Sequence, residues 1–87
     1  MHISVLTPDR NVFDGDARSV KVPGSSGEFE VLDNHAPIVS ALDAGKVQIR
    51  MDKGQMLEFR IEKGFIEVLN NTVSLLVQGY SALPPVQ

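Results

Sequence analysis

The sequence predicts an all-β fold in which eight or nine short strands form a β-sandwich or a flattened barrel. Two observations support this prediction. Apolar and polar residues alternate with a period of two over most of the chain, as strands with one buried face require. Turn-forming Gly, Pro, Asn and Asp residues separate the alternating runs. The 87 residues are enough for one core and too few for two.

The first half of the chain predicts four short strands. The apolar pairs that define them are Ile3 and Val5, Val12 and Phe13, Val20 and Val22, and Phe29 and Val31. We expect turns at Thr7-Pro8-Asp9, at Asp14-Gly15-Asp16 and at Pro23-Gly24, because proline and glycine interrupt strand pairing and aspartate favours turns. These breaks make the strands of this half shorter than those that follow.

Two segments have no clear strand period. The segment from Ala36 to Ala44 could be a helix or a strand. Asn34, which lies just before it, is a candidate helix cap, and the apolar residues of the segment also fit a helical stripe. The last residues contain two prolines and no period. We therefore expect a domain over residues 1–80 and a departing tail over residues 81–87.

Residues 47–61 predict a β-hairpin with a glycine-containing connection. We expect Met51 opposite Leu57, which places Ile49 opposite Phe59 on the buried side. The same register places Arg50 opposite Glu58 on the wet side, and an opposite-charge pair there would stabilise the hairpin by a few tenths of a kcal/mol.

A second hairpin is predicted over residues 66–77. Asn70-Asn71 forms a two-residue turn of type I′, because asparagine tolerates the left-handed backbone conformation. Pairing Leu69 with Thr72 then places Val68 against Val73. Gly64 lies between the two hairpins, where a bulge or a close backbone approach is the usual reason for a glycine. The four phenylalanines are expected on mostly inward positions.

Composition excludes several classes of function. The chain has no cysteine, which rules out disulfides and thiolate metal sites. Its net charge is −3 and no basic run is present, which argues against binding to nucleic acid or anionic lipid. The first ten residues show no secretion signal. No apolar stretch approaches the ~20 residues of a membrane-spanning helix, so we expect no direct membrane insertion.

The stretch GSSGEFEVLDNHAP, residues 24–37, is the one candidate for chemistry. Glu28, Asp33 and His35 fall close together and include the residue types of a proton-transfer set. A metal site needs three or four convergent ligands, and a nucleophile needs a strained turn with an oxyanion motif; the sequence offers neither. We therefore predict no catalytic residue, no metal and no cofactor, and interpret the stretch as a stiff loop of an interaction module.

This same stretch, extended to GSSGEFEVLDNHAPIVSALDAG, resembles the epsilon subunit of bacterial F-type ATP synthases. ISVLTPDRNVFDGDARSVKVPG is similar to the opening of that family, and KGFIEVLNNTVSLLV to its later hairpin. The three motifs occur in the family's order and span nearly the whole chain. The resemblance implies a β-sandwich of about ten strands in which the segment from Ala36 to Ala44 is extended.

The resemblance also implies a function and a set of contact residues. The family is a non-catalytic rotor subunit that grips the gamma subunit and touches the polar loops of the c-ring, coupling ion flow to ATP synthesis at the cytoplasmic face of the bacterial inner membrane. Glu28 matches the acidic position that approaches the c-ring, and His35 matches the histidine near it. Glu30, an acidic residue where the family has a small one, belongs to the same expected contact. Val39 and Ser74 match positions on the gamma side.

Two departures from the family accompany these matches. Asp33-Asn34 stands where the family has Pro-Gly. Typical members continue into two C-terminal helices that inhibit ATP hydrolysis or bind ATP, and this chain ends at Gln87, so we expect neither property here. The alternative to the rotor function is a free-standing sandwich that binds a small molecule or carbohydrate, which would show a concave apolar pocket with a few convergent polar groups.

Overall fold

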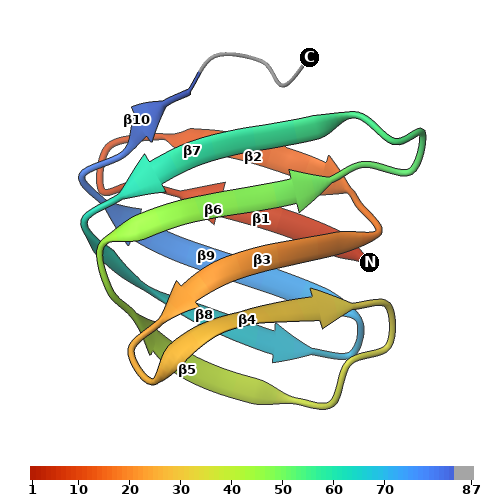
Figure 1. Ribbon diagram of the computed structural model, residues 1–87. Coiled ribbons are helices and arrows are strands. Elements are labelled where there is room, and N and C mark those ends of the chain that lie inside the picture. The colour runs from red at the N-terminus through yellow and green to blue at the C-terminus, as the bar shows by residue number, and fades with distance from the viewer. Residues whose placement is uncertain (84–87) are drawn as a thin grey trace.

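The computed structural model describes residues 1–83 and contains strands and no helix over that range (Figure 1). The ten strands are β1 (His2–Leu6), β2 (Asn11–Asp16), β3 (Ser19–Gly24), β4 (Gly27–Leu32), β5 (Ile38–Leu42), β6 (Gly45–Arg50), β7 (Met56–Ile61), β8 (Lys63–Leu69), β9 (Thr72–Gln78) and β10 (Ser81–Ala82). The strand number agrees with the predicted all-β sandwich of about ten strands, and the segment from Ala36 to Ala44 contains a strand, as the family resemblance implies.

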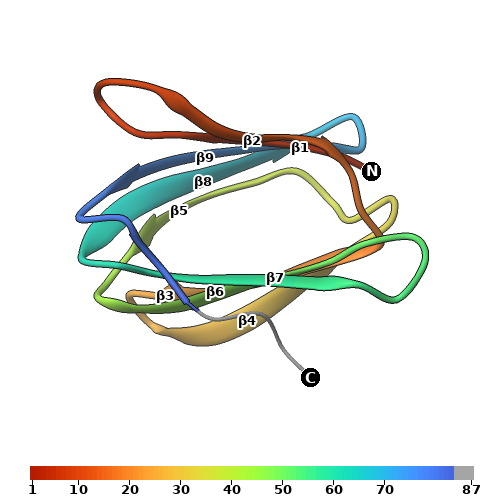
Figure 2. The same cartoon turned by 90° about the horizontal axis from the view of Figure 1, so that it is seen from above.

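The strands form one hydrogen-bonded sheet that curls into two packed layers (Figure 2). One layer has the order β5-β8-β9-β1-β2, and the other has the order β4-β3-β6-β7-β10. A single residue pair, Gly24 with Leu42, joins the layers between β3 and β5. The predicted sandwich, or flattened barrel, is confirmed.

The core lies between the two layers and is filled by one face of each strand. Burial alternates along the strands, as in β9, where Val73, Leu75 and Val77 are buried and the residues between them are not. The prediction that most phenylalanines point inward is confirmed for three of the four: Phe59 is fully buried, and Phe13 and Phe29 pack against the core. Phe13 pairs with buried Val5 and Phe29 with buried Val22, whereas Phe65 points outward and is 57% exposed.

The second predicted hairpin is confirmed in its register. Leu69 pairs with Thr72 and Val68 with Val73. Asn70 and Asn71 both have the positive φ angles, 51° and 59°, that a type I′ turn requires.

The first hairpin forms with a register two residues away from the predicted one. Ile49 pairs with Leu57 and Arg50 with Met56, so the expected Arg50–Glu58 pair is absent. Glu58 instead lies opposite Gln48, whose side-chain amide donates a hydrogen bond to it, and Lys46 Nζ lies 3.6 Å from the Glu58 carboxylate. The cause is a shorter loop: the Met51 N–H donates to the Gln55 carbonyl at 2.7 Å, and Gly54 has a φ of 86°.

One further prediction is corrected at a strand end. Asp14-Gly15-Asp16 is not a turn but the end of β2, and the chain turns at Ala17-Arg18 instead. Within the predicted tail, Ser81 and Ala82 form β10, where Ser81 pairs with Arg60 of β7. Just before the tail, the Tyr80 ring lies 5.1 Å from the Phe59 ring. Residues 84–87 of that tail lie outside the described residues.

Candidate functional site

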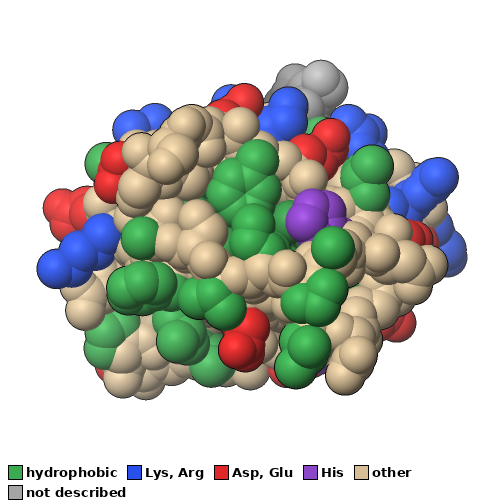
Figure 3. All heavy atoms as spheres, turned by 90° about the horizontal axis from the view of Figure 1, so that it is seen from below, with side chains coloured by type: hydrophobic (Ala, Val, Ile, Leu, Met, Phe, Trp, Pro, Cys, Tyr) green, Lys and Arg blue, Asp and Glu red, His purple; other side chains and the backbone are tan. Residues whose placement is uncertain are grey.

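The outer surface of the layer β5-β8-β9-β1-β2 is unusually apolar. Five large hydrophobic side chains on this surface are exposed, and we call them the apolar face: Leu6, Val39, Phe65, Leu69 and Leu76. Their exposed fractions run from 37% for Leu6 to 71% for Val39. Seen from below, hydrophobic side chains gather over the half of the surface that belongs to this layer, with an acidic side chain among them (Figure 3).

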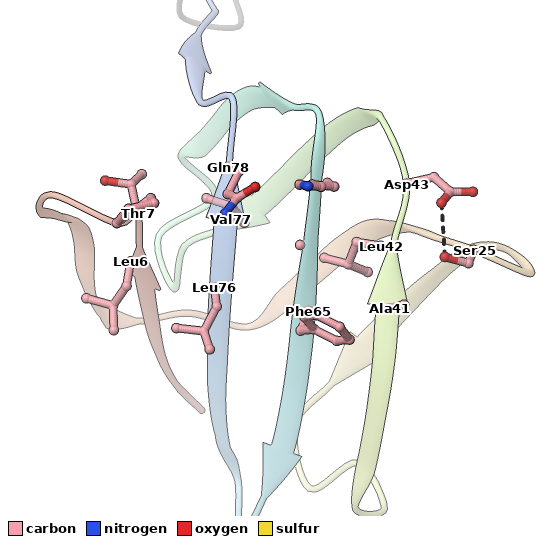
Figure 4. Close-up of a pocket in the computed structure, with 13 residues that line it drawn as sticks. Leu6, Thr7, Ser25, Ala41, Leu42, Asp43, Phe65, Leu76, Val77 and Gln78 are labelled. Carbon is pink, nitrogen blue, oxygen red and sulfur yellow. Dashed lines mark hydrogen bonds between the residues drawn. The ribbon is translucent and has the colours of Figure 1, made fainter.

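Strand register brings these side chains together. Ala41 pairs with Phe65, Phe65 with Leu76, and Leu76 with Leu6, so one row crosses four strands. Directly paired residues point to the same side of a sheet. Figure 4 shows the row, with the four side chains arranged across the neighbouring strands. The row is therefore a continuous apolar strip and not a set of isolated exposed residues.

A groove of about 520 Å³ opens beside this strip. Gly64, which pairs with Leu42 on one side and with Val77 on the other, is among the residues that line it. A Cβ atom at Gly64 would lie 2.5 Å from the Leu76 carbonyl oxygen, so a close backbone approach requires the glycine. Of the two expected reasons for a glycine at position 64, the close backbone approach is therefore the one observed.

The rim of the groove is polar. Ser25 Oγ donates a hydrogen bond to Asp43 Oδ1 at 3.0 Å (Figure 4). Lys63 and Gln78 also border the groove. The groove thus combines an apolar floor with a polar edge, which suits the insertion of an apolar side chain from a partner.

Val39 and Ser74, the two predicted gamma contacts, lie on this same surface. Val39 pairs with Glu67 of β8, and Glu67 pairs with Ser74 of β9, so the two residues flank Glu67 in one row. Val39 is the most exposed member of the apolar face, and Ser74 is half-buried.

Glu28 and Glu30 lie on the other layer and point outward. Glu28 pairs with Pro23 and Glu30 with Lys21, and both acidic residues are exposed. His35 follows the opposite end of β4 from Glu28 and is half-buried. The structure therefore brings Glu28 and Glu30 together but separates them from His35, and one contact surface that includes all three would have to extend along β4.

The loop that carries His35 is tied to its surroundings on both sides. Asp33 Oδ1 lies 2.6 Å from the Met1 amino group, and the Asn34 N–H donates to Asn71 Oδ1 at 2.7 Å. Asn34 takes a φ of 62°, which an asparagine tolerates well, at the position where the family has glycine. His35 Nδ1 lies 2.7 Å from the Ala36 carbonyl oxygen. Asp33 and His35 thus have separate partners and share no hydrogen bond.

Residues 1–83 contain no cluster of three or more histidine, aspartate or glutamate side chains that could hold a metal ion. Nor does this range contain a helix that is long and apolar enough to cross a membrane. The surface feature that sets the molecule apart is the apolar face, together with its groove.

Most of the apolar face was not predicted from the sequence, although the alternation along the strands indicates it. Buried Ile66 and Val68 fix the side of β8 that faces the core, so Phe65 and Leu69 must face outward. Leu76 follows from Val77 and Leu75 in the same way. Large apolar residues on the solvent side of an alternating strand were the signal.

The fold places the chain among small β-sandwich domains, and one outer surface of this sandwich carries the apolar face. Residues 1–82 match the family described as the beta-sandwich domain of the ATP synthase delta/epsilon chain. The chain belongs to this family.

Individual relatives support the same assignment. The chain is 46% identical over 77 residues to the ATP synthase epsilon chain of Leptospira borgpetersenii, covering 87% of this chain and 59% of that protein. It is 41% identical over 81 residues to the ATP synthase epsilon chain of Protochlamydia amoebophila, covering 93% and 55%. The chain therefore spans little more than half the length of these relatives.

Solved structures show the same fold. A chain in the mitochondrial ATP synthase assembly of Euglena gracilis, which contains OSCP, F1 and the c-ring, matches with a TM-score of 0.86 at 18% identity, covering 92% of this chain and 51% of that one. A chain in the central stalk and c-ring of the Tetrahymena thermophila mitochondrial ATP synthase matches with a TM-score of 0.79 at 16% identity, covering 93% and 65%.

Proposed function

We propose that this chain is a non-catalytic part of the central stalk of a rotary F-type ATP synthase, where it docks on the gamma subunit through the apolar face. Its family and its epsilon-chain relatives support this proposal, and the apolar face is the observation that carries it. The domain helps to fix the shaft to the ring so that both turn together, which couples ion flow to ATP synthesis. The domain would then lie at the cytoplasmic side of the membrane because other subunits of the complex hold it there.

The apolar face has the properties of a protein-binding surface. Large contiguous apolar patches are rare on monomeric proteins and usually mark an interface. Here five exposed side chains, a groove and a polar rim lie on one layer of the sandwich. An aromatic or aliphatic side chain of gamma in the groove would be an anchor of the kind that dominates binding energy. Both predicted gamma contacts, Val39 and Ser74, fall on this layer.

The c-ring contact is the second part of the proposal. Glu28 and Glu30 are exposed on the outer side of β4, away from the apolar face, so a contact with polar loops through them leaves the gamma surface free. His35, at the far end of β4, would join only a contact that runs along this strand. Polar contacts of this kind set the register of two partners more than they set affinity.

Binding to the cognate gamma subunit tests the proposal, and the chain offers a matched control. Leu76→Asp places a charge on the apolar face, whereas Leu32→Asp places the same charge on a leucine of similar exposure, 55% against 53%, outside that face. We expect Leu76→Asp to weaken gamma binding at least about 30-fold, a loss of ~2 kcal/mol or more typical of a damaged interface centre. Leu32→Asp should bind normally. Equal binding by both variants would refute the assignment of this face.

The groove is the one observation that favours the alternative function, a free-standing ligand-binding sandwich. Its volume falls within the usual range for small-molecule sites. Titration with small apolar ligands, followed by amide chemical shifts around Gly64, distinguishes the two. Saturable micromolar binding by the isolated domain, together with no affinity for gamma, would favour the alternative.

A further inference from the structure

A single carboxylate occupies the middle of the apolar face. Glu67 pairs in register with Val39 on one side and with Ser74 on the other. Along β8, Phe65 and Leu69 are the next residues that point to the same side. Glu67 is exposed and has no ion pair or side-chain hydrogen bond within residues 1–83.

The other carboxylates of this layer differ from Glu67. In the five strands β1, β2, β5, β8 and β9, the remaining acidic residues are Asp14 and Asp16. Both lie beside His2: its Nε2 is 2.7 Å from Asp14 Oδ1, and its Nδ1 is 3.4 Å from Asp16 Oδ1. Glu67 is therefore the acidic residue of these strands that pairs with no basic side chain of residues 1–83.

Docking of a partner on the apolar face would remove water from the ionised Glu67 carboxylate, which is unfavourable in free energy. A partner that covers Val39, Phe65 and Leu69 also removes water from Glu67, and an ionised carboxylate taken out of water without a partner is strongly unfavourable. The apolar neighbours have no groups to donate. Ser74 has one hydroxyl, which supplies at most one of the several hydrogen bonds that a carboxylate accepts. The compensating charge must come from the docking partner.

We propose that Glu67 receives a cationic side chain, arginine by preference, from the apolar segment of the gamma subunit that docks on this face. This inference rests on the proposed function and adds the chemistry of the partner segment: apolar residues that surround one basic residue. Arginine suits the position because its planar guanidinium donates two parallel hydrogen bonds to a carboxylate and is less strongly hydrated than an ammonium group. Glu67 then determines specificity, since an acidic or wholly apolar surface would leave a charge unpaired.

Three substitutions at Glu67 test the inference against full-length cognate gamma, with dissociation constants measured by calorimetry. We expect Glu67→Gln, Glu67→Leu and Glu67→Arg each to weaken binding about 30-fold or more, because removing one partner of a buried charge pair leaves the other charge unpaired. Glu67→Arg should be the weakest. The matched control is Asp52→Arg, which makes the same change in net charge at an exposed position in the turn between β6 and β7 and should bind like the parent chain.

A charge swap identifies the partner residue. Each lysine or arginine of gamma is changed to glutamate and mixed with Glu67→Arg, and one of these combinations should recover at least tenfold in affinity. Glu67 is exposed, so unchanged thermal unfolding should show that every variant is folded.

The outcomes separate this inference from the proposed function. If Leu76→Asp weakens binding while Glu67→Leu binds as tightly as the parent chain, the ion pair is overturned and the docking face stands. The ion pair is also overturned if Glu67→Arg binds like Asp52→Arg, or if no charge swap restores affinity. If Leu76→Asp binds normally, the docking face is wrong and the ion pair falls with it.

Discussion

Two phenylalanines in this domain should have opposite roles, and comparing their alanine variants tests the division between core and face. Phe59 is fully buried, pairs with Val47 across β6 and β7, and packs its ring against Tyr80. Phe65 is 57% exposed and belongs to the apolar face. Removing the first ring leaves a cavity in the core, whereas removing the second leaves a shallower surface.

The expected magnitudes differ several-fold. Phe59→Ala should cost about 3–5 kcal/mol in free energy of unfolding. A domain of 87 residues has a total stability of roughly 4–13 kcal/mol at ~0.05–0.15 kcal/mol per residue, so this variant will be close to unfolding. With an unfolding entropy of ~0.18 kcal/mol/K for this length, a loss of ~4 kcal/mol lowers Tm by about 20 °C. Phe65→Ala should cost about 1 kcal/mol or less, mainly strand propensity, and lower Tm by about 6 °C at most.

Thermal unfolding followed by circular dichroism measures the first effect, and calorimetric titration with gamma below Tm measures the second. Phe65→Ala should lose at least about tenfold in affinity, whereas folded Phe59→Ala should bind within about threefold of the parent chain. If Phe65→Ala is destabilised as much as Phe59→Ala, Phe65 belongs to the core and the division between core and apolar face is wrong. It is also wrong if Phe65→Ala binds gamma normally.

Three further predictions concern the backbone and the opposite layer. Gly64→Ala should lower the free energy of unfolding by about 1–3 kcal/mol, because the added Cβ meets the Leu76 carbonyl oxygen, and chemical denaturation measures this loss. Asn71→Gly keeps the left-handed turn but removes the acceptor for the Asn34 N–H, so hydrogen exchange at Asn34 should quicken about three- to tenfold, whereas Asn71→Asp should retain protection. Glu28→Ala should leave Tm within about 3 °C of the parent value and weaken c-ring assembly in pull-down, and a large drop in Tm would contradict a role in contact.

The sequence predicted the sandwich well because burial in a strand follows a simple alternation. Val73, Leu75 and Val77 had to share one face, and the asparagine pair at 70–71 had to form a tight turn. Both features are local, and both agree with the structure. The second hairpin was therefore predicted to the residue.

The first hairpin shows where such reasoning ends. Alternation repeats every two residues, so Leu57 can face Met51 or Ile49 with the same side chains buried. The length and conformation of the loop determine which of these registers forms. Gly54 adopts a left-handed conformation and closes a three-residue connection, which selects Ile49. Apolar pattern alone carries no information about that choice.

The candidate site was predicted only in part, for a related reason. Resemblance supplied Val39 and Ser74, but their shared surface follows from β5, β8 and β9 being neighbours, which no local pattern shows. The same order separates His35 from Glu28 along β4, although only six residues lie between them in the sequence. Distance along the chain is a poor guide to distance in an extended strand, which rises about 3.3 Å per residue.

The apolar face is an exception to the alternation of inward apolar and outward polar residues that predicts the fold. Stability of the isolated domain requires apolar residues only at the inward positions of β1, β8 and β9, and an outward leucine or phenylalanine adds little to it. Yet Leu6, Phe65 and Leu76 are outward and become neighbours once the strands pair. Three such exceptions in one row are hard to attribute to folding. Glu67, beside that row, also supports a role in binding, because a charge at the centre would weaken a purely apolar contact.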